Sequence, residues 1–261
     1  MNPSAGRTVT IVALPPLPEV RPTDDLPSLI ATAWQALAAS EPALAPAAGD
    51  ALVVTQKVVS KAEGRLIDLR TVEPRPEAVA FASQWDRDPR QVEIVLRESA
   101  EVLRMERGLI ISRTRHGFVC ANAGVDASNV GGADQVTLLP EDPDASASAI
   151  REALRARLGI DIAIVVSDSF GRPWRWGIVD VALGVAGFAP LVDLRGTPDA
   201  DGREMHATVV AVADQIASAA ELAAGKTSRR PVVLVRGLGL PAGGGSIRGD
   251  VVMSAEADLF S

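Results

Sequence analysis

The segment GDALVVTQKVVSKAEGR (residues 49–65) joins a short apolar run directly to a stretch that carries two lysines. Its apolar part, ALVVT, is rich in β-branched residues and predicts a buried strand. Lys57 and Lys61 follow that strand at once. A second apolar run, IDIAIVV (160–166), leads in the same way into Ser167–Asp168–Ser169. Because ligands of open α/β sheets bind beyond the carboxyl ends of strands, the two segments predict a site at one sheet edge.

Outward from these segments, the periodicities of strands and helices alternate along the chain, which favours an α/β architecture. We find no internal repeat and no flexible linker, so we expect one domain over residues 1–261. The expected strands are 8–13, 51–55, 160–166, 231–235 and a strand pair within 109–121. The expected helices are 26–39, 76–85, 88–105, 140–159 and 207–224.

Composition places the chain among ordinary globular proteins. Hydrophobic residues make up 47% of the 261 residues and charged residues 23%, which excludes wholesale disorder. A formal net charge of −7, from 26 basic and 33 acidic residues, argues against a nucleic-acid partner. The N-terminus lacks the apolar core of a signal peptide, and a run of about 18 apolar residues is absent, so we expect no membrane partner and a cytoplasmic location. The single cysteine, Cys120, excludes an internal disulfide.

Oxygen-bearing side chains follow the expected strands and indicate a metal–nucleotide site. Asp168 and Ser169 follow one strand, and Asp126 and Asn129 lie in a loop earlier in the chain. Mg²⁺ and Mn²⁺ prefer oxygen ligands and bridge substrate phosphates, while lysine supplies a compact positive charge for the same phosphates. Two structural interpretations stay open. An aspartate at a strand end often caps a turn or a helix, and lysines often lie on a solvated surface.

Three other patterns lie outside this set. FGRPWRWG (170–177) places Arg172 and Arg175 beside two tryptophans, which fits either a clamp for an acidic substrate group or a cation–π packing pair. AAGKTS (223–228) resembles the end of a phosphate-binding loop but lacks its first glycine, so Gly225 is expected to be a helix C-cap. Two histidines and one cysteine exclude a zinc cluster built from these residues alone.

Several stretches together resemble the coenzyme F420 γ-glutamyl ligase family. They are GDALVVTQKVVSKAEGR (49–65), HGFVCANAGVDASNV (116–130), LLPEDPDASA (138–147), VVSDSFGRPWRWG (165–177) and PVVLVRGL (231–238), in the family's order. The resemblance implies an α/β fold particular to the family, with a mixed sheet and two lobes, which is not a Rossmann domain. It also implies an intertwined homodimer. The chain resembles the single-module form, without the C-terminal nitroreductase-like domain of some relatives.

The same resemblance implies a reaction and its partners. Family members add L-glutamate to the terminal carboxylate of coenzyme F420-0, a deazaflavin cofactor precursor, with GTP as co-substrate. They use Mg²⁺ or Mn²⁺ and often respond to K⁺. We expect the γ-phosphate of GTP to move to the carboxylate and form an acyl phosphate, which the glutamate amine then attacks.

The resemblance also assigns residues. Asp126 and Asp168 match the metal carboxylates, and Ser169 stands where the family usually has threonine. Lys61 is expected to neutralise charge on the transferred group, so the expected catalytic residues are Lys61, Asp126 and Asp168. The expected nucleotide contacts are Leu17, Pro18, Glu19, Val20, Gln56, Lys57, Lys61 and Asn129. Where some relatives place a glutamate or glutamine as a second-metal ligand, this chain has Lys226, so the completeness of a second metal site stays open.

Two other classes of protein remain as alternatives at this stage. A metal-dependent nucleotide phosphohydrolase would use the same aspartates on two metals and would break down nucleotide without L-glutamate. A non-catalytic nucleotide-binding protein would bind GTP without turnover. Against the second alternative, a protein that only binds nucleotide has little need for several separate acidic and basic loops that converge on one site.

Overall fold

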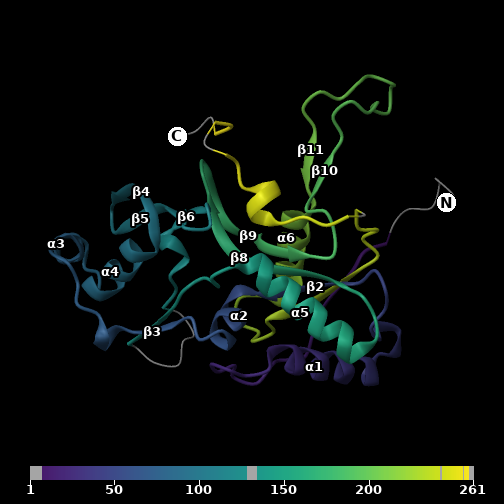
Figure 1. Ribbon diagram of the computed structural model, residues 1–261, viewed down its shortest axis with the longest axis horizontal. Helices are drawn as coiled ribbons and strands as arrows, with labels where there is room; N and C mark the ends of the chain where they lie inside the picture. The colour runs from purple at the N-terminus through teal and green to yellow at the C-terminus, as the bar shows by residue number, and fades with distance from the viewer. Residues whose placement is uncertain (1–7, 128–133, 242, 255, 259–261) are drawn as a thin grey trace.

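Five strands form the central sheet of the computed structural model, which describes residues 8–127, 134–241, 243–254 and 256–258. In spatial order they are β1 (Thr10–Ala13), β12 (Val232–Arg236), β2 (Ala51–Thr55), β8 (Ala163–Arg172) and β9 (Arg175–Ala186). β2 and β8 run parallel, and the other neighbouring pairs are antiparallel (Figure 1). The sheet is therefore mixed, and the expected α/β class is confirmed.

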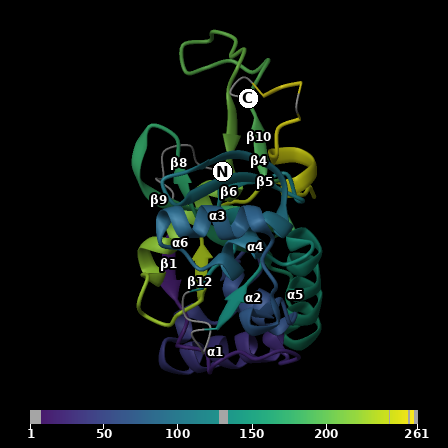
Figure 2. The same cartoon turned by 90° about the vertical axis from the view of Figure 1, so that its left-hand side faces the viewer.

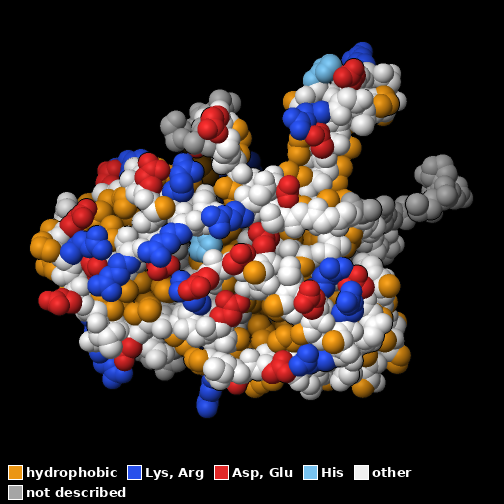
Figure 3. Space-filling view, in the orientation of Figure 1, with side chains coloured by type: hydrophobic (Ala, Val, Ile, Leu, Met, Phe, Trp, Pro, Cys, Tyr) orange, Lys and Arg blue, Asp and Glu red, His pale blue; other side chains and the backbone are white. Residues whose placement is uncertain are grey.

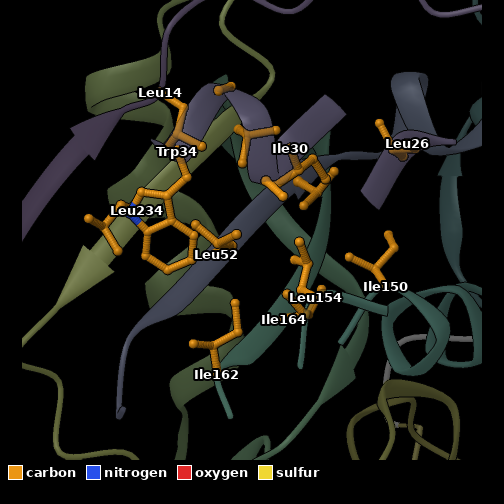
Figure 4. Packing of buried hydrophobic residues seen from close by; sticks show 14 of the residues in the cluster. Leu14, Leu26, Ile30, Trp34, Leu52, Ile150, Leu154, Ile162, Ile164 and Leu234 are labelled. Atoms are coloured by element: carbon orange, nitrogen blue, oxygen red, sulfur yellow. The ribbon is translucent and has the colours of Figure 1, made fainter. Parts of the chain in front are cut away.

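Helices cover both faces of this sheet because successive strand residues alternate between the faces. The covering helices are α1 (Leu26–Ser40), α5 (Pro143–Leu158) and α6 (Val212–Ala224). Leu52 and Val54 pack with residues of α1 and α5, whereas Ala51 and Val53 pack with residues of α6. The buried indole of Trp34 on α1 lies against the first face (Figure 4). The core thus consists of two apolar layers, one on each side of the sheet.

The ends of α5 follow from its sequence. The Asp142 carboxylate accepts a hydrogen bond from the backbone N–H of Ala145 at 2.9 Å, which satisfies a free donor of the first turn. Pro143 stands at the start of the helix, where its missing N–H costs nothing. Gly159 ends the helix at φ 71°, a left-handed conformation that glycine adopts without strain. The helix expected within 140–159 is confirmed.

Shorter elements surround the central sheet. The helices are α2 (Gln56–Ala62), α3 (Pro76–Trp85) and α4 (Pro89–Glu98), with short helical turns at Pro42–Leu44, Leu69–Thr71, Asn122–Gly124 and Ile247–Val251. The small sheets pair β3 (Leu66–Asp68) with β7 (Gln135–Thr137), β4 (Ser99–Glu106) with β5 (Leu109–Thr114) and β6 (Val119–Ala121), and β10 (Leu191–Asp193) with β11 (Val209–Ala211). α3 and α4 lie beside β4–β6 at one end of the molecule (Figure 2).

The structure corrects one expected helix. The segment 88–105 was expected to be a single helix, but α4 ends at Glu98 and β4 begins at Ser99. Arg107 and Gly108 both have positive φ, so the chain turns back and β4 pairs with β5. The side chain of Val102, which the helical pattern placed inside, is 42% exposed. Pairing with the next strand along the chain overrides the local helical periodicity here.

Two further expectations change near the site. The strand expected at 160–166 continues to Arg172 and turns back as β9, a long strand that the sequence interpretation missed. The helix expected from residue 207 begins only at Val212, because residues 209–211 belong to β11. β10 and β11 form an arm that projects from the body of the molecule (Figures 1 and 3).

Within the described ranges, no helix has the length and apolar character needed to cross a membrane.

Candidate active site

The carboxyl ends of the two parallel strands meet at one edge of the central sheet. Thr55 and Ser167 are the last residues paired between β2 and β8. Beyond this pair, the first strand continues as α2, which carries Lys57, while the second continues to Asp168. The sheet edge expected from the sequence therefore exists, and the lysines and Asp168 leave it from adjacent strands.

Lys57 makes an ion pair across the site. Its Nζ lies 2.6 Å from Oδ2 of Asp126. The backbone of Asp126 is fixed by two hydrogen bonds with Thr137, at 3.0 and 2.8 Å, so the loop that follows β6 is held against β7. Residues 56–62 of α2 and Asp126, which are far apart in the sequence, therefore converge. Asn129, the other residue expected from this loop, lies outside the described residues.

The environment of Asp168 disfavours its charged form. Burial raises the pKa of its carboxyl to about 6, and the backbone N–H of Ser169 opposes this by stabilising the anion. The negative charges of Asp180 and Asp126 raise the pKa further, and the positive charge of Lys57 lowers it. Burial and two neighbouring carboxylates therefore disfavour the deprotonated form of Asp168, and Lys57 offsets part of this effect.

Lys61 joins the N-terminal segment to the same edge. Its side chain is 8% exposed, and its Nζ lies 2.5 Å from Oε1 of Glu19, which is 67% exposed. Val20 is buried in the core beside α1, and Leu17 packs at the margin of that core. The loop that contains Leu17, Pro18, Glu19 and Val20 is thus anchored by its apolar residues and directs its carboxylate to Lys61.

Gln56 is the most enclosed residue of the expected nucleotide set. It is 2% exposed, and its side-chain N–H groups donate to Oγ of Ser60 at 2.7 Å and to the carbonyl of Leu138 at 3.0 Å. These bonds tie α2 to the segment that follows β7. The observed contacts of Gln56 therefore hold the first turn of α2, and with it Lys57, in place.

A second group of polar side chains lies around Ser169. Ser169 and Asp180 are direct partners in the β8–β9 register, and the serine Oγ donates to Oδ1 of Asp180 at 2.6 Å. Lys226 Nζ lies 2.5 Å from the same Oγ, 3.2 Å from Asp180 Oδ1 and 3.1 Å from Glu221 Oε1. Because neighbouring strand residues point to opposite faces, Ser169 belongs to this group while Asp168 belongs to the Lys57 side. Ser169 therefore has Asp180 and Lys226 as side-chain partners, whereas Asp126 pairs with Lys57.

Comparison with known proteins now decides the family. A family model described as F420-0:Gamma-glutamyl ligase matches residues 16–237. The coenzyme F420:L-glutamate ligase of Methanopyrus kandleri is 44% identical over 232 residues, which is 88% of this chain and 88% of that protein. The ligases of the same name from Methanothermobacter thermautotrophicus and Methanocaldococcus jannaschii are 47% identical over 190 residues and 40% identical over 213 residues. These matches cover 72% and 81% of this chain, and 75% and 84% of the respective relatives.

The chain belongs to the F420-0:gamma-glutamyl ligase family. It is therefore an enzyme, a ligase, and the resemblance seen in its sequence is confirmed. The family match covers every described site residue named above.

Sequence reasoning missed two acidic residues of this ligase and left a third residue unassigned. Asp180 lies in β9, which was not expected, and Glu221 lies on α6. One signal was available for Asp180: it is a lone charge in the apolar run IVDVALGVA (178–186), and a buried carboxylate needs a partner. Lys226, to which the sequence pattern assigns no role, forms ion pairs with both Asp180 and Glu221. Gly225 ends α6, so the expected C-cap is confirmed and AAGKTS is not a phosphate loop.

Arg172 and Arg175 lie at the far end of the β8–β9 hairpin, where they are paired in register. Arg172 donates from Nη2 to the carbonyl of Trp176 at 3.2 Å.

A groove of about 290 Å³ begins beside the same strands and is lined in part by Phe118 and Phe170. The rings of these phenylalanines meet edge to face, with their centroids 6.3 Å apart. The hairpin therefore offers an apolar wall near Asp168 and two cations at its tip.

The residues around Asp168 fit a hard divalent cation that shares its coordination with a nucleotide. Within the described ranges, no cluster of three or more histidine, cysteine, aspartate or glutamate side chains is arranged to hold a metal by itself. Asp126 and Asp168 supply carboxylate oxygens, which Mg²⁺ and Mn²⁺ prefer, and these ions usually take further ligands from phosphates and water. Burial, with the charges of Asp180 and Asp126, raises the pKa of Asp168, and a bound cation would offset that cost to the carboxylate form.

Proposed function

We propose that this ligase joins L-glutamate to the terminal carboxylate of coenzyme F420-0 in a GTP-dependent reaction. The relatives that match most of its length carry the name coenzyme F420:L-glutamate ligase. One observation carries the proposal to this chain: Lys57 and Asp126 pair at 2.6 Å and both act electrostatically on the half-buried Asp168, at the edge from which α2 carries Lys61. Lysines that can bind phosphates and a carboxylate that can bind a metal thus leave adjacent strand ends, and Asp126 reaches them from the loop after β6.

The reaction proceeds in two steps that conserve atoms and charge. First, a carboxylate oxygen of F420-0 attacks the γ-phosphorus of GTP, the bond to the β-phosphate oxygen breaks, and GDP leaves. The product is an acyl phosphate. Second, the amine nitrogen of L-glutamate attacks the acyl carbon, phosphate leaves, and the amine proton passes to solvent or to a carboxylate. GTP is needed because the oxygen of a free carboxylate is a poor leaving group.

The chain's residues position the reactants and balance charge. Lys61, nearly buried, faces the transferred phosphoryl group and stabilises the charge that develops on it. Leu17, Pro18, Glu19 and Val20, with Gln56, Lys57 and Asn129, form the proposed nucleotide site. Asp126 and Asp168 would hold Mg²⁺ or Mn²⁺, which supplies Lewis-acid neutralisation of the phosphates. Ser169, expected as a further ligand, forms hydrogen bonds with Asp180 and Lys226.

The acidic substrate binds toward the β8–β9 hairpin in this proposal. The flat deazaflavin ring of F420-0 would lie along Phe118 and Phe170, because aromatic rings stack or meet edge-on at such walls. Arg172 and Arg175 would hold acidic groups of the substrate, since a guanidinium binds a carboxylate or phosphate through two parallel hydrogen bonds.

The assembly and location are also proposals. We propose that residues 1–261 form a single ligase domain with two interleaved lobes, that the lobes differ from a Rossmann domain, and that two copies intertwine as a homodimer. The projecting β10–β11 arm is a segment that a second copy would contact (Figure 1). K⁺ is proposed as an activating ion, and the cytoplasm as the location.

A single set of incubations tests the function. The full chain is mixed with GTP, Mn²⁺, L-glutamate and F420-0, and the deazaflavin product is examined by mass spectrometry. We expect a mass gain of one or more glutamyl units that disappears when any one component is omitted. Release of phosphate from GTP without L-glutamate and F420-0 would instead identify a metal-dependent phosphohydrolase. Binding of GTP with neither product would identify a nucleotide-binding protein without turnover.

A further inference from the structure

Lys226 binds three oxygen atoms that come from three separate elements. Its Nζ contacts Oγ of Ser169 on β8 at 2.5 Å, Oδ1 of Asp180 on β9 at 3.2 Å and Oε1 of Glu221 on α6 at 3.1 Å. An ammonium group has three N–H donors, so these contacts can use all of them. The lysine lies directly after the helix C-cap at Gly225, which fixes the start of its side chain.

The carboxylates of this cluster require a cation. The Asp180 side chain is only 8% exposed, and its two oxygens already accept hydrogen bonds from Ser167 and Ser169. A buried carboxylate without a positive partner is strongly destabilising. Burial lowers the pKa of Lys226, but its contacts with Glu221 and Asp180 outweigh this and raise the pKa above its usual value. Two carboxylates within 3.2 Å of Nζ thus hold the lysine as their cationic partner.

We propose that Lys226 is a tethered cation that replaces a second divalent metal ion in this ligase. It occupies the oxygens of Ser169, Asp180 and Glu221, so the site takes one divalent ion per chain, on the Asp126 and Asp168 side. The inference rests on the proposed function, because it assumes that Asp126 and Asp168 bind a metal with the nucleotide. It also removes Ser169 from the ligands of that metal.

The chemistry of the cluster supports this exchange of cations. Carboxylate and hydroxyl oxygens within about 3 Å of one point are the donors that Mg²⁺ and Mn²⁺ prefer, so the cluster would attract a divalent ion if the lysine were absent. A lysine ammonium is a compact point charge that satisfies the same oxygens with one positive charge. Being covalently attached, it is present at every metal concentration.

The stoichiometry of Mn²⁺ tests the inference independently of turnover. Free Mn²⁺ is followed by electron paramagnetic resonance while it is titrated into the full chain with saturating GDP. The wild-type chain is expected to bind about one Mn²⁺, and Lys226→Met, which keeps the length of the side chain and removes its charge, about two. Lys226→Arg keeps the charge and is expected to bind about one. Arg70→Gln removes a paired cation elsewhere, on Asp68, and should also bind about one.

Two results would overturn the proposal: two Mn²⁺ ions on the wild-type chain, or a count that stays at one in Lys226→Met. The wild-type count decides the matter even if Lys226→Met does not fold, which a circular-dichroism melt detects. Failure of the proposed function is recognised separately. No Mn²⁺ on any variant would remove the metal site at Asp126 and Asp168, and the lysine inference with it, whereas two on a wild-type chain that still adds glutamate would overturn the lysine inference alone.

Discussion

Lys57 Nζ lies 2.6 Å from Asp126 Oδ2 and ties the helix after one central strand to a loop after the small β4–β6 sheet. The pair is partly exposed, with 19% of the lysine side chain and 38% of the aspartate side chain accessible to solvent. An exposed ion pair contributes little to stability, so we infer that the main effect of this pair is to hold Lys57 and Asp126 in position. It sets a positive and a negative group side by side where a metal–nucleotide complex needs both.

Replacing Lys57 tests that placement. Lys57→Met removes the positive charge that lowers the pKa of Asp168, so this pKa should rise above its present value of about 6. We expect GTP binding to weaken by about tenfold or more, because a charge-assisted phosphate contact is lost. Isothermal titration with GTP and Mn²⁺ measures the affinity. Unchanged affinity would contradict the assignment of Lys57 to the nucleotide.

Asp168→Asn should raise the stability of the metal-free protein and abolish its ligase activity. In the metal-free protein the carboxyl has a folded pKa of about 6 against an ordinary value of 3.8, so the folded state binds the proton more tightly than the unfolded state. The resulting cost to folding is absent below about pH 4, grows as pH rises, and is complete above about pH 6. The asparagine variant should then be more stable than wild type by up to about 3 kcal/mol at pH 8 in EDTA, and lack ligase activity.

Urea unfolding at pH 4 and pH 8 measures this difference. Asp193→Asn is the matched control, because Arg195 holds the pKa of that exposed carboxyl down at about 2. Asp193→Asn should therefore lower the free energy of unfolding at pH 8, and only slightly. A stability gain that does not change between pH 4 and pH 8 would contradict the account of Asp168.

Lys61 is expected to act on the transferred phosphoryl group. Lys61→Met should lower kcat by about 100-fold to 1000-fold, as for the loss of one preorganised donor to a developing charge, with a smaller change in the KM for GTP. Steady-state kinetics of glutamate addition give both constants. Arg70→Gln, which removes a distant surface cation, should leave them unchanged. An equal loss of kcat in both variants would indicate a general effect of charge.

Arg172→Gln and Arg175→Gln should weaken the binding of the acidic substrate F420-0 and leave the binding of GTP nearly unchanged. A hydrogen bond to a charged group contributes about 1.5–3 kcal/mol, so the KM for F420-0 should rise about tenfold or more in at least one variant. The KM for GTP should stay within about twofold, since the hairpin tip lies four residues along an extended strand from Asp168, about 13 Å. A parallel rise in the KM for GTP would place the arginines elsewhere in the mechanism.

Gly184 on β9 tests the packing behind the site. A Cβ at this position would lie 2.1 Å from the carbonyl oxygen of Pro143 and 2.5 Å from the backbone N of Asp144, both in the backbone at the start of α5. Gly184→Ala should therefore destabilise the protein by about 1–3 kcal/mol or more, because α5 must move. Gly171→Ala is the control, since nothing lies within 4 Å of its Cβ. Urea midpoints compare the two, and equal midpoints would refute this account of the close contact.

Some of the site was predictable from local sequence. The apolar runs at 51–55 and 160–166 each lead into polar residues, and parallel strands place their carboxyl ends together. The position of Lys57, Lys61 and Asp168 at one edge followed from this rule. The N-terminal segment was placed only through family resemblance, because a proline-rich loop carries no periodic signal of its own.

Local patterns and the quoted motifs were enough to predict the α/β class, most helices, the family and the edge of the sheet that carries the lysines. Three features are visible only in the folded protein: residues 99–106 form a strand, β9 pairs with β8, and Asp180, Glu221 and Lys226 meet at Ser169. Such pairings depend on strand register and on contacts between elements up to 57 residues apart, as between Lys226 and Ser169. Local periodicity contains no information about which distant charge will neutralise a buried carboxylate.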